Sequence, residues 1–215
     1  YLRQQIARLK RLGKIRTSET YTAALRSFSG FMNDREVLFD QINANLIAEY
    51  EAYLKGRGNS PNTMSFYMRI LKAIYNRAAE DGLTEQRYPF KSVYTGVEKT
   101  LKRAISLNDL KRIKGLDLSL KPNLDFARDM FLFCFYTRGM SFIDMAYLRK
   151  KDLQNGILSY RRRKTGQQLF IKWEKCMQEI VDKYPENKTE FLLPIITQRN
   201  GDYRKQYTNE LHRVN

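Results

Sequence analysis

Apolar side chains recur every three or four positions through the first part of the chain, the spacing that gathers them on one face of an α-helix. A first stripe comprises Leu2, Ile6, Leu9 and Leu12. Further stripes begin at Tyr21, Ile42 and Met64, and such stripes are typical of a packed core. The pattern predicts a small helical bundle over residues 17–83, preceded by a basic helix or linker over residues 1–16.

Polar and conformationally special residues indicate where these helices begin and end. Thr17 or Ser18 is predicted to cap the first helix of the bundle. Ser60 is predicted to cap its last helix, with Pro61 at the first helical position and Gly82 at the end.

A break in the periodicity then separates two halves of the chain. A proline, a glycine and the charged run 98–103 interrupt residues 84–104, which we interpret as a linker. Helical spacing resumes at Ser106, which pairs with Asp109 as a capping box. Residues 105–215 are therefore predicted to form a second domain.

The longest apolar stretch of the second domain predicts a buried helix over residues 122–137. The side chains predicted to face the core are Leu124, Ala127, Met130, Phe131, Cys134 and Phe135. Arg138 and Gly139 end this helix. Ser141 and Asp144 are predicted to cap a short helix that follows.

Alternating residues next predict a β-hairpin. Its strands cover residues 157–162 and 168–171, on either side of Lys164–Thr165–Gly166. Helices are predicted over residues 173–184 and from residue 204 to the last residue. The fold class predicted for the chain is mainly α with a small β-hairpin or sheet.

Charge then narrows the range of functions. The 215 residues include 39 Lys and Arg against 23 Asp and Glu, a net charge of +16, with 42% hydrophobic residues. This charge on a folded chain indicates a polyanionic partner, first DNA or RNA and second an anionic membrane surface. The alternative is a basic protein that binds no polyanion. The sequence contains no run of about 18 apolar residues, so it predicts no membrane-spanning helix. Two cysteines and one histidine argue against a zinc site and favour a reducing cytoplasm.

Arginine and lysine are also the strongest candidates for chemistry. The sequence has no Gly-rich phosphate loop and no cluster of carboxylates typical of a two-metal nuclease. Arg138 follows a buried helix, so it either satisfies helix-end carbonyls or binds a phosphate. Lys164 follows Arg161, Arg162 and Arg163 at the hairpin tip, which is either a solvated turn or a device that reaches into a DNA groove.

The order of these parts resembles the tyrosine recombinases of the phage-integrase superfamily, particularly the integrases of Bacteroides-type mobile elements. Residues 17–21 and 60–63 look like the helical core-binding domain of that family. Residues 135–144 (FYTRGMSFID) resemble its first catalytic-arginine box, and residues 160–167 (YRRRKTGQ) resemble its catalytic-lysine hairpin. The resemblance covers nearly the whole chain.

The resemblance implies a site-specific recombinase or integrase of a mobile element that cuts DNA through a 3′-phosphotyrosyl intermediate, with no metal or other cofactor. Carried over, Arg138 is the first phosphate-binding arginine, Lys164 is the general acid and Asp144 has a supporting role. Asp144 and Leu148 align with the family's acid and leucine, which places the family's arginine position at Ser141. Either Arg138 reaches the phosphate through a small insertion or this position is unconventional, and we favour Arg138.

The family's second box and its tyrosine nucleophile lie beyond the last helix seen here. Tyr203 and Tyr207 come too early to be that tyrosine, and His212 is expected on the surface. We therefore expect a C-terminally truncated recombinase that does not complete cleavage. The alternatives are a non-enzymatic DNA-binding protein of the same fold and a basic RNA-binding protein.

The implied partner is duplex DNA carrying core-type recombination sites, in the bacterial cytoplasm and away from membranes. The complete protein is expected to act as a tetramer on DNA, and the chain alone to be a monomer. The residues predicted to contact DNA, as a group, are Thr17, Ser60, Asn62, Thr63, Arg69, Lys72, Arg161, Arg162 and Arg163. Ordinary helix capping or solvation is the alternative for each one.

Overall fold

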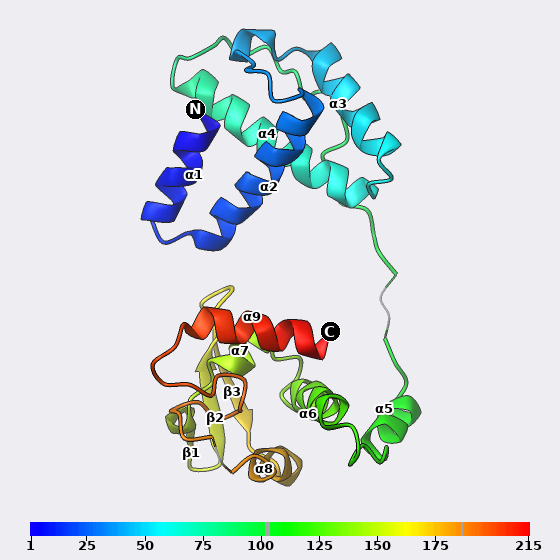
Figure 1. Cartoon of the computed structure of the whole chain (residues 1–215), viewed down its shortest axis with the longest axis vertical. Coiled ribbons are helices and arrows are strands. Elements are labelled where there is room, and N and C mark those ends of the chain that lie inside the picture. Colours follow the sequence, from blue (N-terminus) through cyan, green and yellow to red (C-terminus); the bar gives the residue numbers. More distant parts are fainter. Residues whose placement is uncertain (102–103, 186) are drawn as a thin grey trace. The chain divides into compact units, whose positions relative to one another are not determined.

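The computed structural model describes residues 1–101, 104–185 and 187–215 (Figure 1). The chain divides into two compact units, Tyr1–Lys102 and Arg103–Asn215, each with its own hydrophobic core. Lys102 and Arg103, the end of the charged run predicted in the linker, lie outside the described residues.

The first unit is built from helices packed around one core. Its elements are α1 (Leu2–Arg11), α2 (Ile15–Phe31), the 3-10 turn η1 (Phe39–Gln41), α3 (Ala44–Gly56) and α4 (Pro61–Glu80). The side chains of Asn43 and Ser60 accept hydrogen bonds from first-turn amides at 2.9 and 3.3 Å, and so cap α3 and α4. The predicted cap at Ser60 and the predicted position of Pro61 are confirmed.

Aromatic rings fill the centre of this unit. Tyr50 of α3 is fully buried, and its ring lies 5.1 and 5.2 Å from the ring centroids of Phe28 and Phe31 of α2. The Tyr50 hydroxyl donates to the Ser27 hydroxyl at 2.7 Å. Burial raises the pKa of Tyr50 to about 12, because a phenolate there would lose its hydration.

The start of α2 differs from the prediction. Gly13, with φ of +71°, separates α1 from α2, and α2 begins at Ile15. Thr17 and Ser18 therefore lie within the helix, and the predicted N-cap at either residue is wrong. The hydroxyl of Ser18 donates instead to the Ile15 carbonyl at 2.7 Å. The left-handed glycine turn allows α1 to fold back onto α2, so residues 1–16 are part of the first compact unit.

Part of the predicted linker also packs on the first unit. Phe90 and Val93 are only 3% and 8% exposed and belong to the same core as α3 and α4. Two apolar side chains can join a neighbouring core without any helical periodicity of their own. The hydrophobic pattern therefore placed the end of the first domain at residue 83, before these two residues.

The second unit combines helices with a small sheet. Its elements are α5 (Leu107–Lys114), α6 (Pro122–Tyr136), α7 (Phe142–Ala146), the 3-10 turn η2 (Lys150–Asp152), β1 (Leu153–Gln154), β2 (Ile157–Arg161), β3 (Gln168–Lys172), α8 (Lys175–Asp182) and α9 (Tyr203–Val214). The strands form an antiparallel sheet in the order β1-β2-β3, with Ser159 opposite Phe170. In the part of the chain that the structure describes, no helix has the length and apolar character needed to cross a membrane.

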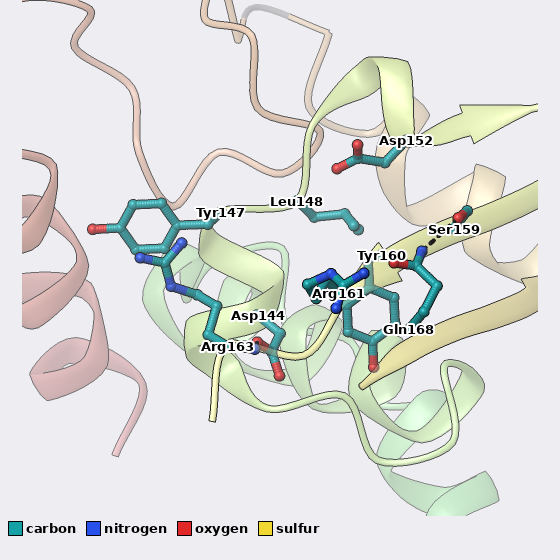
Figure 2. A pocket seen from close by; sticks show the side chains of 9 residues that line it. All are labelled: Asp144, Tyr147, Leu148, Asp152, Ser159, Tyr160, Arg161, Arg163 and Gln168. Atoms are coloured by element: carbon teal, nitrogen blue, oxygen red, sulfur yellow. Dashed lines mark hydrogen bonds between the residues drawn. The ribbon is translucent and has the colours of Figure 1, made fainter. Parts of the chain in front are cut away.

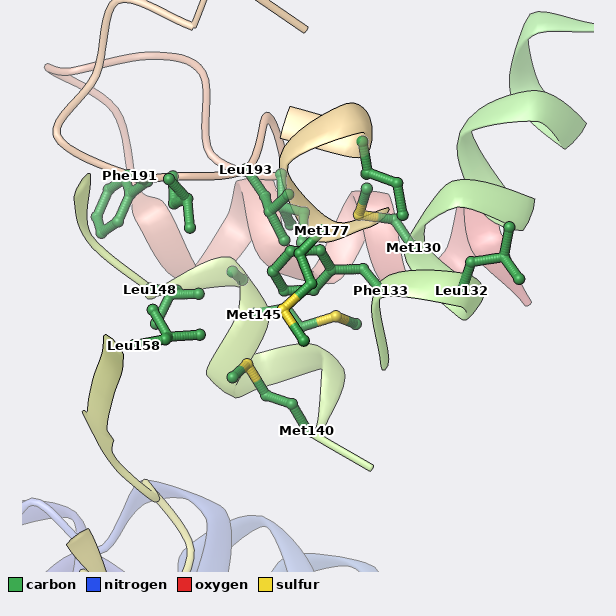
Figure 3. Packing of buried hydrophobic residues seen from close by; sticks show 14 of the residues in the cluster. Met130, Leu132, Phe133, Met140, Met145, Leu148, Leu158, Met177, Phe191 and Leu193 are labelled. Atoms are coloured by element: carbon green, nitrogen blue, oxygen red, sulfur yellow. The ribbon is translucent and has the colours of Figure 1, made fainter. Parts of the chain in front are cut away.

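Helix α6 supplies the centre of the second core, where Met130 and Phe133 pack with Met177 of α8 (Figure 3). The predicted buried face of α6 is wrong in part, because three of its members are exposed: Leu124, Phe131 and Phe135. Three other apolar side chains of the helix are buried instead: Phe126, Leu132 and Phe133. Apolar residues surround most of this helix, so their spacing does not select one face.

A buried ion cluster joins α6 to the end of α8. Asp129 is 4% exposed, and its carboxylate accepts hydrogen bonds from Lys183 and Tyr184, both at 2.7 Å. The Arg128 guanidinium lies 3.2 Å from the same carboxylate. Burial raises the pKa of Tyr184, and the hydrogen bond to Asp129 raises it further. Burial alone would lower the pKa of Lys183, but its hydrogen bonds to Asp125 and Asp129 raise it.

Candidate nucleic-acid interface

The β2–β3 hairpin presents four consecutive cations, Arg161–Lys164. The backbone amide of Gly166 donates to the Arg162 carbonyl at 2.7 Å and closes the turn. Gly166 has φ of +71°, a conformation that other L-residues adopt only with strain. The hairpin is thus confirmed, and the side chain of Lys164 is exposed at its tip.

The base of the hairpin turn is fixed to α7 by a buried carboxylate. The backbone amide of Arg163 donates to Oδ1 of Asp144 at 2.9 Å. The Ser141 hydroxyl donates to the other oxygen of Asp144 at 2.6 Å. It also accepts from the Asp144 amide at 3.4 Å, which confirms Ser141 as the N-cap of α7. The Arg163 guanidinium also lies 4.0 Å from the ring centroid of Tyr147. These contacts join the predicted arginine box to the predicted lysine hairpin.

A polar pocket of about 370 Å³ lies beside this anchor (Figure 2). Its lining includes the carboxylates of Asp144 and Asp152 and the guanidinium groups of Arg161 and Arg163. Arg161 donates to the Gly166 carbonyl at 2.7 Å, so two of the four hairpin cations are already engaged within the protein. The two arginines in the pocket wall therefore stabilise the base of the hairpin through contacts within the protein.

Burial raises the pKa of Tyr160, which also lines this pocket. The nearby carboxylate of Asp144 raises the same pKa further. The phenol of Tyr160 therefore stays protonated well above neutral pH.

Arg138 lies at the end of α6 in a left-handed conformation, with φ of +58°. The helix-end carbonyls are satisfied without its side chain. The Thr137 hydroxyl donates to the Phe133 carbonyl at 2.6 Å, and the Gly139 amide donates to the Cys134 carbonyl at 2.8 Å. Across residues 1–101, 104–185 and 187–215, the Arg138 guanidinium has no hydrogen bond or ion pair. Of the two roles left open by the sequence, this geometry favours an external anion.

The structure does not join Arg138 to the hairpin by any contact among the described residues. Arg138 lines a largely apolar groove of about 460 Å³ with Leu107 and Phe135, whereas the hairpin is anchored on Asp144. Ser141, at the family's arginine position, has its hydroxyl engaged by Asp144.

The predicted DNA-binding residues of α4 do not share one environment. Ser60 and Thr63 bond to each other through their hydroxyls at 3.0 Å, as capping residues do. Asn62 uses both ends of its side-chain amide to bind the backbone of Glu98. Arg69 and Lys72 are exposed on the same helix.

The remaining predicted DNA-binding residues are accessible to differing degrees. Within the described ranges, the side chains of Arg69, Lys72, Arg162 and Lys164 form no hydrogen bond or ion pair. Thr17 is exposed on α2, where its carbonyl accepts from the Thr20 hydroxyl at 2.7 Å. Among the predicted site residues, the cations without a side-chain partner in the described ranges are thus Arg69, Lys72 and Arg162 from the DNA-binding group and Arg138 and Lys164 from the catalytic pair.

Sequence reasoning missed two contacts in the elements that carry the predicted residues. Tyr147 supports the Arg163 guanidinium, and no motif marks it because the contact depends on the fold of α7 against the hairpin. Ser65 is fully buried and donates to the Gly96 carbonyl, a contact that links α4 to a segment 31 residues later. Spacing within a helix carries no signal for either contact.

Residues 1–95 match the family model described as a phage integrase SAM-like domain. A search among curated proteins finds no match.

Solved structures of lambda integrase share the fold. The chain is 14% identical to a lambda integrase tetramer bound to a Holliday junction, with a TM-score of 0.67, covering 96% of this chain and 61% of that one. It is 13% identical to lambda integrase residues 75–356 bound to DNA, with a TM-score of 0.66, covering 99% and 77%. The chain thus spans less than two thirds of the integrase in the tetramer. The chain has the mainly helical fold seen in lambda integrase, with a three-stranded antiparallel sheet, and its first 95 residues match the phage integrase SAM-like domain.

Proposed function

We propose that this chain is the DNA-binding part, with a portion of the catalytic domain, of a site-specific tyrosine recombinase of a mobile element. The observation that carries the proposal is the hydrogen bond between Asp144 and the Arg163 amide. It unites two motifs, separated in sequence, that the recombinase resemblance identifies independently. The SAM-like domain and the lambda integrase fold support the same function.

The proposed substrate is duplex DNA, bound mainly through phosphate contacts. The free cations Arg69, Lys72, Arg162 and Lys164 can each neutralise a phosphate, and Arg161 and Arg163 shape the hairpin that carries two of them. Related assemblies include a lambda integrase tetramer on a Holliday junction, and we propose a tetramer on DNA here as well. The site of action would be DNA in the bacterial cytoplasm.

In the proposed reaction a tyrosine phenol loses its proton to solvent and its oxygen attacks phosphorus. The bond from phosphorus to the 5′-oxygen breaks, and a 3′-phosphotyrosyl link forms. Lys164 would donate the proton that the leaving 5′-oxygen takes up. Arg138 would offset the negative charge that builds on the phosphoryl oxygens. We propose no residue of this chain as the nucleophile.

A second candidate is a DNA-binding protein of the same fold that does not cut DNA. The environment of Ser141 favours it, because this residue stands at the family's arginine position and its hydroxyl caps α7 through Asp144. The two candidates share the DNA interface and differ only in the chemical step.

Binding tests the interface that both candidates need. Fluorescence anisotropy would compare a labelled duplex with a structured RNA of equal length and charge at matched salt. We expect tighter binding to the duplex and a steep fall in affinity as salt rises. Lys164→Ala should reduce the slope of log K against log salt by about 1. Lys111→Ala, which removes an exposed lysine of α5 outside the predicted site residues, is the matched control variant and should leave the slope closer to wild type. Equal affinity for RNA, or a Lys164→Ala slope equal to wild type, would contradict the proposal.

A further inference from the structure

The segment that leaves the first unit runs along the start of α4 and is held there by three contacts. The Tyr94 amide donates to the Glu51 carboxylate at 3.1 Å. The buried hydroxyl of Ser65 donates to the Gly96 carbonyl. Asn62 then binds Glu98, the last residue of the segment with such a contact. All of these residues belong to the first unit.

The contact at Asn62 is two-sided. Its Nδ2 donates to the Glu98 carbonyl at 3.2 Å, and its Oδ1 accepts from the Glu98 amide at 2.8 Å. The side-chain amide thus satisfies both polar groups of one backbone residue, as a neighbouring strand would. Aspartate could serve only the amide, and alanine neither group.

From this geometry we infer that Asn62 is a latch that holds Glu98 on the first unit and fixes where the connection to the second unit starts. Residues 99–105 then separate Glu98 from Ser106, the N-cap of α5. Seven residues span at most about 25 Å, and release of Glu98 would free residues 97 and 98 up to the Gly96 contact and add about 7 Å. The latch therefore sets how far apart the two units can bind.

This role differs from the DNA contact that the sequence predicts for Asn62. Both hydrogen-bonding ends of its amide are committed to Glu98, so a contact between that amide and DNA requires the latch to open. The consequence for DNA rests on the proposed function, because the reach of the connection matters only when both units bind one duplex. The latch itself does not depend on DNA.

Amide hydrogen exchange, resolved by NMR on the whole chain, tests the latch directly. We expect Asn62→Ala to speed exchange of the Glu98 amide at least tenfold, while Asn62→Asp, which keeps the acceptor, changes it less than threefold. Asn76→Ala is the matched control, because Asn76 lies on the same helix and accepts a hydrogen bond from Gln86 instead. Unchanged exchange at core amides such as that of Leu71 would show that the fold is intact.

An Asn62→Ala rate at Glu98 no higher than that of Asn76→Ala would overturn the inference. Digestion with a protease specific for glutamate gives a second readout, since cleavage after Glu98 should accelerate only in Asn62→Ala. Addition of duplex DNA to the wild-type chain is the third. The Glu98 amide should stay protected from exchange in the complex. Loss of that protection would show that the Asn62–Glu98 contact opens on DNA, and would contradict its role as a latch in the complex. If no DNA binds, the proposed function fails, but the exchange result in the free chain still decides the latch.

Discussion

Replacing Asp144 by alanine should release the hairpin from α7. The carboxylate is 4% exposed and accepts from the Arg163 amide at 2.9 Å and from the Ser141 hydroxyl at 2.6 Å. Hydrogen bonds to a charged group contribute about 1.5–3 kcal/mol each, so the loss of two should cost the second unit about 3 kcal/mol or more. Asp144→Asn keeps the acceptor for Arg163 and should cost about 1 kcal/mol. Urea unfolding followed by near-ultraviolet circular dichroism measures both values.

The effect on DNA binding separates anchoring from simple charge. Asp144→Ala removes one negative charge and raises the net charge from +16 to +17, which by itself favours DNA. If the anchor places Arg162 and Lys164, affinity should instead fall several-fold, and the salt slope should fall by about 1 to 2. Anisotropy titrations from 50 to 200 mM salt measure this. Equal or tighter binding, with the Arg163 amide still protected from exchange, would refute the reasoning.

Further measurements address the framework that carries the interface. Asp129→Asn should destabilise the second unit by about 2 kcal/mol in urea, because it removes one of the two carboxylate charges of α6 that bind Lys183 at the end of α8. Because folding raises the pKa of Tyr50 from 10 to about 12, the neutral phenol stabilises the folded state. This stabilisation is fully present below pH 10 and is lost as the pH rises toward 12. Wild type should therefore lose about 1.4 kcal/mol relative to Tyr50→Phe between pH 9 and 11, and parallel curves would contradict this. Ser60→Ala should cost about 1 kcal/mol through loss of the cap on Thr63, and Ser60→Asp should recover most of it.

Local signals in the sequence located most elements well. Ser60 with Pro61, and Ser106 ahead of Asp109, mark helix starts because each cap acts within four residues. The hairpin about Lys164 is equally local, since a short glycine turn and two alternating strands suffice to specify it. Features decided within one turn or one strand pair are therefore readable from sequence.

Features decided between elements were not readable in the same way. Helix α6 is apolar on several sides, so only the packing of its neighbours determines that Phe133 is buried and Phe131 is exposed. The stacking of Arg163 on Tyr147 and the binding of Asn62 to Glu98 also depend on segments brought together by folding. In the candidate site, sequence identified the charged residues but not which of them the protein already engages.

Covalent capture of DNA tests the recombinase assignment most directly. The protein, as its gene encodes it, would be incubated with suicide substrates built from the ends of the proposed mobile element, and denaturant-stable adducts would be mapped by mass spectrometry. We predict a phosphotyrosyl adduct whose rate of formation falls by about 100- to 1000-fold in Arg138→Ala, while Ser141→Ala stays much closer to wild type. Absence of an adduct on every such substrate, or an adduct that forms equally fast in Arg138→Ala, would contradict the account.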